Sequence, residues 1–221
     1  MFFSLLSTGA AQSQDWSNLQ HYKAENAALP DPLPGEERVV FIGNSITIGW
    51  LHAVPEFFEG KPYVNRGISG QTTPQMLLRF RQDVIDLKPG VVLILAGTND
   101  IAENTGPMTL DQILDNLKSM AELALANGIE PVMCSVLPAR DYPWSPGLRP
   151  DEKIPRLNEM VKAFSKEREL VYLDYFSLLA NDNNGLDKSL AEDGVHPTPK
   201  AYRLMGALAE EAIRKALGKI R

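Results

Sequence analysis

The chain of 221 residues carries 22 Lys and Arg against 28 Asp and Glu, and a net charge of −6 leaves no basic field that would attract nucleic acid or an anionic membrane surface. Hydrophobic residues make up 44% and charged residues 23%, a globular balance that excludes a disordered, collagen-like or polytopic membrane protein. The length suits one domain with a sizeable core, and Cys134, as the single cysteine, excludes an intrachain disulfide and a cysteine-rich zinc site.

Residues 1–11 are apolar and then small, ending in Gly9-Ala10-Ala11. This pattern is typical of the second half of a secretory signal peptide, and because the positively charged start is missing we expect a truncated one. The segment is shorter than the roughly 20 apolar residues of a membrane span, so no membrane insertion is expected. We therefore predict a secreted or periplasmic protein, with a cytosolic chain and a floppy N-terminus as the alternative. The polar, proline-containing residues 12–37 predict an N-terminal arm lying over a domain at 38–221.

From Arg38 onward, short apolar runs alternate with amphipathic segments. Runs of Val, Ile and Leu bounded by turn residues are typical of buried strands. Such strands are predicted at 39–42, 91–96, 131–136 and 170–173, with a weaker candidate at 63–65.

Helices are predicted between these strands from their capping residues and apolar spacing. Thr73-Pro74 begins one helix, and the capping box from Thr109 to Gln112 begins a second that Gly128 ends. A third helix is predicted around 154–164, and a last one begins at Thr198-Pro199.

Strands that are apolar throughout and alternate with helices require a sheet covered on both faces. The predicted fold is therefore a three-layer α/β/α sandwich with a mainly parallel, five-stranded sheet. Ligands of such folds bind at the carboxyl ends of the strands, so functional residues are expected directly after each strand.

Polar residues follow the strands at four places. These segments are 43–47 (Gly-Asn-Ser-Ile-Thr), 65–70 (Asn-Arg-Gly-Ile-Ser-Gly), 97–100 (Gly-Thr-Asn-Asp) and 193–197 (Asp-Gly-Val-His-Pro). On the fold argument they meet on one rim, where they would supply a serine nucleophile, a base, a carboxylate to orient the base and donors for an oxyanion.

The histidine of this set is chosen by elimination. His52 lies seven residues after Ser45, roughly 10 Å away if that stretch is helical, which is too far for proton transfer. His21 lies in the polar arm. His196 remains, and Asp193, three residues earlier in a glycine-containing turn, is placed to orient its ring.

Other catalytic motifs are missing from the sequence. It contains no Gly-x-Ser-x-Gly, no phosphate-binding Gly-x-x-x-x-Gly-Lys, no Gly-x-Gly-x-x-Gly and no His-Glu-x-x-His. We therefore expect no cofactor and no metal ion.

The four blocks, in this order and each at a strand end, resemble those of the SGNH hydrolases, also called GDSL-like lipases or acylhydrolases. The resemblance implies a flavodoxin-like fold with Ser45 as nucleophile, His196 as base and Asp193 as its partner. It also implies an oxyanion hole formed by the N–H groups of Ser45 and Gly67 and the side-chain amide of Asn99. The first block departs from the family pattern Gly-Asp-Ser, since residue 44 is asparagine.

Each block also has a plainer structural interpretation. Ser45 suits a helix cap, Gly67 a turn, and Asp193-Gly194 is a common turn dipeptide. For Asp100 capping is the favoured interpretation, and Cys134 is expected to be a buried strand residue.

Four further residues are candidates for contacts with substrate. They are Asn44 beside the nucleophile, Trp50 five residues after Ser45, and Tyr142 and Trp144 in the proline-rich loop 141–147. The aromatic rings would stack on a sugar, line an acyl pocket or simply pin the loop.

The sequence thus predicts a serine esterase that removes short acyl groups, acetyl foremost, from a carbohydrate or other small substrate. One alternative is an acylhydrolase of lysophospholipids or long-chain lipids. Another is a non-catalytic glycan-binding module on a hydrolase scaffold. The expected partner is the ester substrate alone, and the sequence carries no prediction of oligomeric state.

Overall fold

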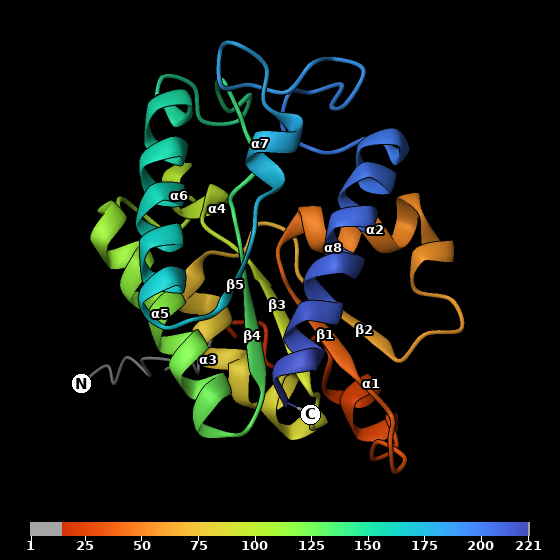
Figure 1. Cartoon of the computed structure of the whole chain (residues 1–221). Helices are drawn as coiled ribbons and strands as arrows, with labels where there is room; N and C mark the ends of the chain where they lie inside the picture. Colours follow the sequence, from red (N-terminus) through yellow and green to blue (C-terminus); the bar gives the residue numbers. More distant parts are fainter. Residues whose placement is uncertain (1–14, 221) are drawn as a thin grey trace, which may run out of the picture.

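A five-stranded sheet forms the centre of the computed structural model, which describes residues 15–220 (Figure 1). All neighbouring strands pair in parallel, in the order β2-β1-β3-β4-β5. The strands are β1 (Val39–Gly43), β2 (Tyr63–Gly67), β3 (Val91–Leu95), β4 (Glu130–Cys134) and β5 (Val171–Leu173). Every predicted strand is confirmed, and the sheet is wholly rather than mainly parallel.

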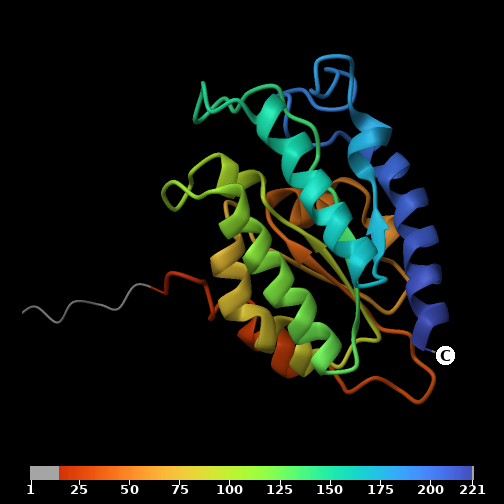
Figure 2. The same ribbon diagram turned by 60° about the vertical axis from the view of Figure 1, so that its left-hand side comes forward.

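Helices cover both faces of this sheet (Figure 2). Successive residues of a strand point to opposite faces, so in β1 Val40 and Ile42 pack under one set of helices while Val39 and Phe41 pack under the other. The first set is α3 (Thr73–Asp83), α5 (Leu110–Ala126) and α6 (Pro150–Glu167). The second set is α2 (Ser45–Ala53), α7 (Tyr175–Leu179) and α8 (Pro199–Ile220). The three-layer prediction is confirmed.

The capping residues begin the helices where the sequence predicts. Thr109 accepts the N–H of Gln112, and Gln112 accepts the N–H of Thr109, which forms the capping box of α5. Thr72 is the N-cap of α3, with Pro74 in the first turn. Helix α6 begins four residues before the predicted 154, at Pro150, since proline suits a first helical turn.

The remaining elements are α1 (Lys23–Ala28), α4 (Thr98–Ile101) and the 3-10 turns η1 (Pro55–Phe57) and η2 (Ile85–Leu87). These short elements were not predicted, and neither were α2 and α7. Such elements offer too few residues for a periodic pattern to show in the sequence.

Residues 15–37 run along β2 and α3. Tyr22 donates to the carbonyl of Gly67, and the Asn26 amide bonds to Asp83 of α3. The predicted signal peptide, 1–11, lies outside the described residues, so the division into leader, arm and domain stays a prediction. Within residues 15–220, no helix is long and apolar enough to span a bilayer.

Candidate active site

The junction of β1 and α2 carries Ser45. Strand β1 ends at Gly43, and Ser45 is the first residue of α2. The side-chain oxygen of Asn44 accepts the N–H of Ile46 at 3.0 Å, which fixes the start of the helix. Ser45 therefore lies, partly exposed, at a helix N-terminus, where unpaired N–H groups and the helix dipole favour negative charge.

The loop before α8 brings His196 to Ser45. Ser45 Oγ and His196 Nε2 are 2.9 Å apart, and His196 Nδ1 lies 2.6 Å from Asp193 Oδ2. The other carboxylate oxygen of Asp193 accepts the backbone N–H groups of Val195 and His196, which holds the turn closed. The three residues that the sequence singles out thus form one continuous hydrogen-bonded series.

The carboxyl of Asp193 is held in its charged form. Partial burial disfavours the charge, but hydrogen bonds from the His196 ring and from the N–H groups of His196 and Val195 outweigh it. They keep the pKa of Asp193 below its usual range. An ionised Asp193 accepts a hydrogen bond from the N–H group at His196 Nδ1, which leaves Nε2 unprotonated and able to accept the proton of Ser45 Oγ.

Asn99 approaches from the end of β3. It lies in α4, is 3% exposed, and its side-chain nitrogen donates to the carbonyl of Gln71 at 2.9 Å. An amide nitrogen carries two N–H groups, so this bond orients the side chain and leaves the second N–H available to a ligand.

Gly67 does not have the position that the resemblance implies. It is the last residue of β2, and its N–H donates to Asn65 Oδ1 at 3.0 Å. A Cβ on Gly67 would lie 2.3 Å from the backbone nitrogen of Ile48, so a glycine is needed here to let β2 approach α2. The prediction of a Gly67 donor is therefore corrected: this N–H is already bonded, and the residue serves packing.

Two of the candidate substrate contacts are also corrected. The side chain of Asn44 is buried and caps α2, so it has a structural role. Trp50 is 2% exposed and stacks on Phe57 and Tyr202 within the core between α2 and α8. Five residues along a helix, at about 100° per residue, turn a side chain roughly 140° away from Ser45, which explains why Trp50 faces the core.

The aromatic loop separates into a buried and an exposed ring. Tyr142 is fully buried, and its hydroxyl lies 2.9 Å from Thr98 Oγ1, so its prediction as a substrate contact is wrong. Trp144 is 45% exposed, and its ring centroid lies 6.1 Å from that of His196. Of the four candidates, only Trp144 presents an exposed ring beside His196.

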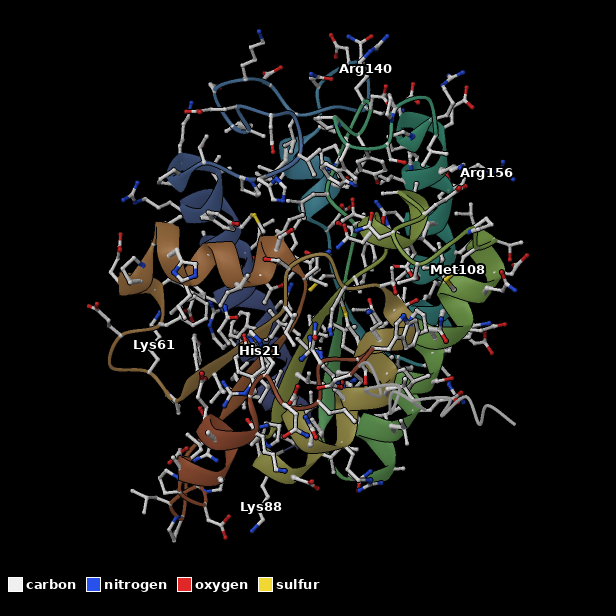
Figure 3. The ribbon with its side chains drawn as sticks, turned by 180° about the vertical axis from the view of Figure 1, so that it is seen from behind. His21, Lys61, Lys88, Met108, Arg140 and Arg156 are labelled. Atoms are coloured by element: carbon white, nitrogen blue, oxygen red, sulfur yellow. The ribbon has the colours of Figure 1, made fainter. Side chains whose placement is uncertain are left out.

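The other histidines and the cysteine lie apart from this series. His21 packs edge-on against Tyr22 in the arm, and Figure 3 shows it well below the loop that carries Arg140. His52 is in the last turn of α2, at the opposite end from Ser45. Cys134 is buried in β4, as expected. Within residues 15–220, no cluster of His, Cys, Asp and Glu could hold a metal ion.

Sequence reasoning missed a buried arginine behind the site. Arg79 of α3 is fully buried, forms an ion pair with Asp83 at 3.0 Å, and donates to the Gln71 side chain at 2.6 Å. Its third nitrogen donates to the carbonyl of Gly43, two residues before Ser45. A signal was present, because residue 79 lies between Met76 and Phe80 on the apolar face of the helix.

Asp100 has the capping role that the sequence favours. One carboxylate oxygen accepts both the N–H and the hydroxyl of Thr73 at the start of α3. The other oxygen is buried without a hydrogen-bond partner in the described part of the chain. Burial, only partly offset by the bonds from Thr73, raises the pKa of Asp100 to about 6.

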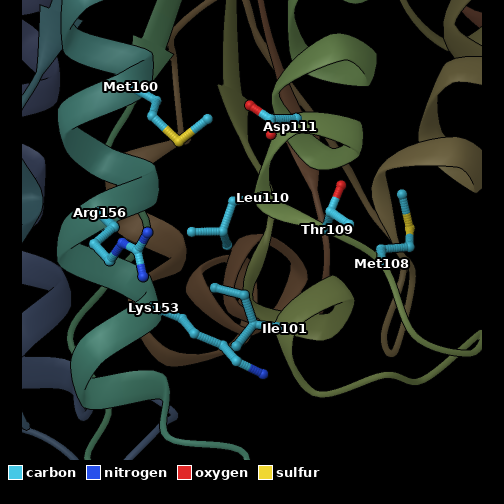
Figure 4. A pocket seen from close by; sticks show the side chains of 8 residues that line it. All are labelled: Ile101, Met108, Thr109, Leu110, Asp111, Lys153, Arg156 and Met160. Carbon is cyan, nitrogen blue, oxygen red and sulfur yellow. The ribbon is translucent and has the colours of Figure 1, made fainter.

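Hollows flank the catalytic loop. One of about 340 Å³ is lined by His196, Asp193 and the following prolines, and one of about 350 Å³ lies between loop 140–146 and Asp193. A third, of about 400 Å³, lies between α4, α5 and α6 and contains none of the residues of the catalytic series (Figure 4). Substrate is therefore expected in the two hollows that share Asp193, one of which His196 also lines.

Known proteins resemble this chain in both sequence and structure. Residues 41–204 match the GDSL-like Lipase/Acylhydrolase family. A solved structure from Bacteroides fragilis NCTC 9343, named as an acylhydrolase, is 45% identical and superimposes with a TM-score of 0.89, over 92% of this chain and 99% of that chain.

Two curated relatives are more distant. The lipoprotein YqeF of Bacillus subtilis (strain 168) is 26% identical over 213 residues, which cover 77% of this chain and 87% of that protein. An acetylxylan esterase of Xylanibacter ruminicola is 26% identical over 224 residues, which cover 85% of this chain. The match spans 45% of that esterase, so this chain corresponds to less than half of its length.

Proposed function

Because the chain belongs to the GDSL-like lipase/acylhydrolase family, the SGNH hydrolases, and is a carboxylic ester hydrolase, we propose that it is a serine esterase in which Ser45 is the nucleophile. The observation that carries the proposal is the hydrogen-bonded series from Ser45 Oγ to His196 at 2.9 Å and from His196 to Asp193 at 2.6 Å. A serine, a base within proton-transfer distance and a carboxylate that orients the base are the parts of a nucleophilic triad.

The first half of the reaction acylates Ser45. Its oxygen attacks the ester carbonyl while His196 Nε2 takes the hydroxyl proton, and Asp193 stabilises the imidazolium without taking that proton. The C–O bond to the leaving alcohol then breaks as His196 returns the proton to the alcohol oxygen. The products of this half are the free alcohol and an acyl ester on Ser45.

The second half hydrolyses this ester. Water attacks the acyl carbonyl and gives a proton to His196, and the bond to Ser45 Oγ breaks as His196 protonates that oxygen. The carboxylic acid leaves, and the serine is restored. No cofactor takes part in either half.

Two donors in this site suit the negative oxygen of each tetrahedral intermediate. The backbone N–H of Ser45 lies at the N-terminus of α2, and Asn99 holds a second amide N–H ready. Gly70 is the candidate for a third donor, because this exposed turn residue with φ +77° adjoins Gln71, whose carbonyl orients Asn99.

Short acyl groups, acetyl foremost, suit the surroundings of the triad. The hollows beside His196 and Asp193 carry the charged side chains of Arg140, Asp141 and Glu192 among their prolines, rather than a long apolar channel. A long acyl chain needs a mostly apolar, enclosing pocket. The relative named an acetylxylan esterase supports acetyl esters of carbohydrates.

The decisive experiment compares Ser45→Ala with wild type on p-nitrophenyl acetate and with a fluorophosphonate probe. The variant should lose both hydrolysis and labelling, because the acyl group and the probe are both expected to bond to Ser45 Oγ. Ser119→Ala, which removes a hydroxyl bonded within α5, is the matched control and should retain both. Near-normal turnover by Ser45→Ala would refute the assignment.

Two further measurements separate the alternative functions. A series of p-nitrophenyl esters of increasing chain length should peak at acetate; a peak at long chains would favour a lipid substrate instead. Saturable glycan binding without probe labelling of wild type would indicate a non-catalytic module.

We also propose that the protein acts outside the cytoplasm. The apolar segment 1–11 and a relative named a lipoprotein both support export. Fractionation of the native host should recover the esterase activity from the periplasm, envelope or medium. Recovery from the cytosol would contradict this proposal alone and leave the esterase assignment intact.

A further inference from the structure

Trp144 is the exposed aromatic ring nearest to the chemistry. Its centroid lies 6.1 Å from that of His196, at an interplanar angle of 37°. Trp144 keeps 45% of its surface exposed, which leaves a large apolar area in contact with solvent even though other side chains lie close by. Such an exposed ring beside a reactive group suits recognition of a ligand.

The ring is held rigidly in this exposed position. Tyr142 stacks on it at a centroid distance of 5.2 Å and an angle of 28°, and Tyr142 is itself fully buried and bonded to Thr98. The indole N–H donates to Asn104 Oδ1 at 3.2 Å, and the amide of Asn104 donates to the carbonyl of Gly70. Because Tyr142 covers one face, the exposed area lies mainly on the opposite face and the outer edge.

Polar groups line a hollow next to the residue on which this ring stacks. The hollow, of about 350 Å³, is lined by Tyr142 and by Arg140, Asp141 and Asp193 together with Pro143 and Pro146. Arg140 is exposed and has no hydrogen-bond or ion-pair partner within residues 15–220, so its guanidinium is available to a hydroxyl or carbonyl oxygen. The site therefore combines one flat apolar surface with directional hydrogen-bonding groups.

We propose that Trp144 is a stacking platform for the sugar ring of an acetylated pyranoside, and that it determines the substrate class of the enzyme. The proposal rests on the esterase function proposed above and names the alcohol part of its ester. The pyranose ring lies on the open face of Trp144 while the acetyl carbonyl reaches Ser45, with Arg140 within the adjoining hollow.

The chemistry of the surroundings favours a sugar over an acyl chain as the occupant. One face of a pyranose presents C–H groups, which are attracted to the negative face of an aromatic ring, while its edge presents hydroxyl groups. An acyl chain has no polar edge and would leave Arg140 without a partner. A single open ring also encloses too little of a chain to bind it well.

The test compares two acetyl esters that differ in the ring. Xylopyranose tetraacetate carries a pyranose, and glycerol triacetate does not. The measured quantity is the ratio of kcat/KM on the sugar ester to kcat/KM on the glycerol ester. In Trp144→Ala this ratio should fall roughly 3- to 10-fold, the size expected for one aromatic stacking contact. Trp144→Phe, which keeps a flat ring, should recover most of it.

Trp16→Ala is the matched control, because Trp16 is also 45% exposed but lies on the arm. Its ratio should equal that of wild type. A ratio that stays unchanged in Trp144→Ala, or that falls as far in Trp144→Phe, would overturn the platform. If wild type hydrolysed neither ester, that result would instead refute the proposed function.

Binding without turnover gives a second measurement. Titration of Ser45→Ala with xylopyranose tetraacetate should change the tryptophan fluorescence, and the change should vanish in Ser45→Ala/Trp144→Ala. A change that persists without Trp144 would overturn the platform, whatever the outcome of the kinetic test.

Discussion

Replacement of Asp100 by asparagine tests whether the buried charge of this carboxylate lowers the free energy of unfolding at neutral pH. Asp100 is 1% exposed, one of its oxygens accepts two hydrogen bonds from Thr73, and the other has no partner among the described residues. Asparagine has nearly the same shape and keeps an oxygen for Thr73. The variant therefore removes the charge while preserving the cap of α3.

The magnitude follows from the shift in pKa. Burial raises the pKa of Asp100 from 3.8 to about 6, and one unit corresponds to about 1.36 kcal/mol, so the shift corresponds to about 3 kcal/mol. Between these two pKa values the folded protein binds the proton and the unfolded chain does not. Wild type is therefore most stable, as far as Asp100 is concerned, below pH 3.8. Its free energy of unfolding decreases by this amount as the pH rises from 3.8 through 6.

The assay is urea denaturation of wild type and Asp100→Asn at several pH values from 4 to 8. All other titrating groups contribute equally to both proteins, so their difference isolates Asp100. Relative to wild type, the variant should gain about 2.5 kcal/mol of stability between pH 4 and pH 8. Its amide nitrogen, buried without an acceptor, adds a cost of about 1–3 kcal/mol that does not change with pH.

Asp182→Asn, which replaces an exposed carboxyl in a loop, is the control. Its difference from wild type should vary far less over this range. A difference between Asp100→Asn and wild type that stays constant from pH 4 to pH 8 would refute the reasoning, because it would mean that Asp100 titrates alike in the folded and unfolded states.

Three further substitutions probe the site and its support. Asn99→Ala should lower kcat on p-nitrophenyl acetate about 100- to 1,000-fold with a smaller change in KM, the usual cost of one oxyanion donor; equal kcat would exclude Asn99 from that role. Arg79→Met should lower the free energy of unfolding by about 3–5 kcal/mol in urea denaturation, because it leaves the buried Asp83 carboxylate without its ion-pair partner; a loss below 1 kcal/mol would contradict this. Gly67→Ala should reduce both the melting temperature and kcat, since its Cβ would displace α2 at Ile48, and a fully active variant would show that the contact can relax.

The fold could be predicted from the sequence because its signals are local. The segment 91–96, which contains β3, is an unbroken apolar run, and a run this short is typical of a strand buried on both faces. Thr109 and Gln112 mark the start of α5 through a bond that requires no tertiary contact. The hydrogen-bonded series of Ser45, His196 and Asp193 could be predicted for a related reason. Parallel strands bring their carboxyl ends to one edge, and elimination of the other two histidines leaves His196.

The substrate contacts could not be predicted so well, since they depend on where a strand ends and which way a ring turns. Strand β2 continues through Gly67, so this glycine lies inside the sheet edge rather than in the turn that follows. Tyr142 and Trp144 are two residues apart in a loop, and nothing in their spacing indicates that one is buried beneath the other. Periodicity predicts orientation in helices and strands, and a loop has none.

The buried guanidinium of Arg79 shows why the catalytic geometry depends on residues that never touch substrate. Its planar group donates both to the backbone carbonyl of Gly43, two residues before Ser45, and to the side chain of Gln71. The backbone carbonyl of Gln71 in turn accepts a hydrogen bond from the side chain of Asn99. Arg79 thus fixes both the segment that leads to Ser45, the proposed nucleophile, and the position of Asn99, the proposed oxyanion donor. Lysine cannot replace this fork of donors, because its ammonium is a single point on a flexible stem. Ser45 follows β1 and Asn99 follows β3, and these strands pair directly as far as Gly43 and Leu95. Beyond that pairing, Arg79 and Gln71 form a further link between the two segments.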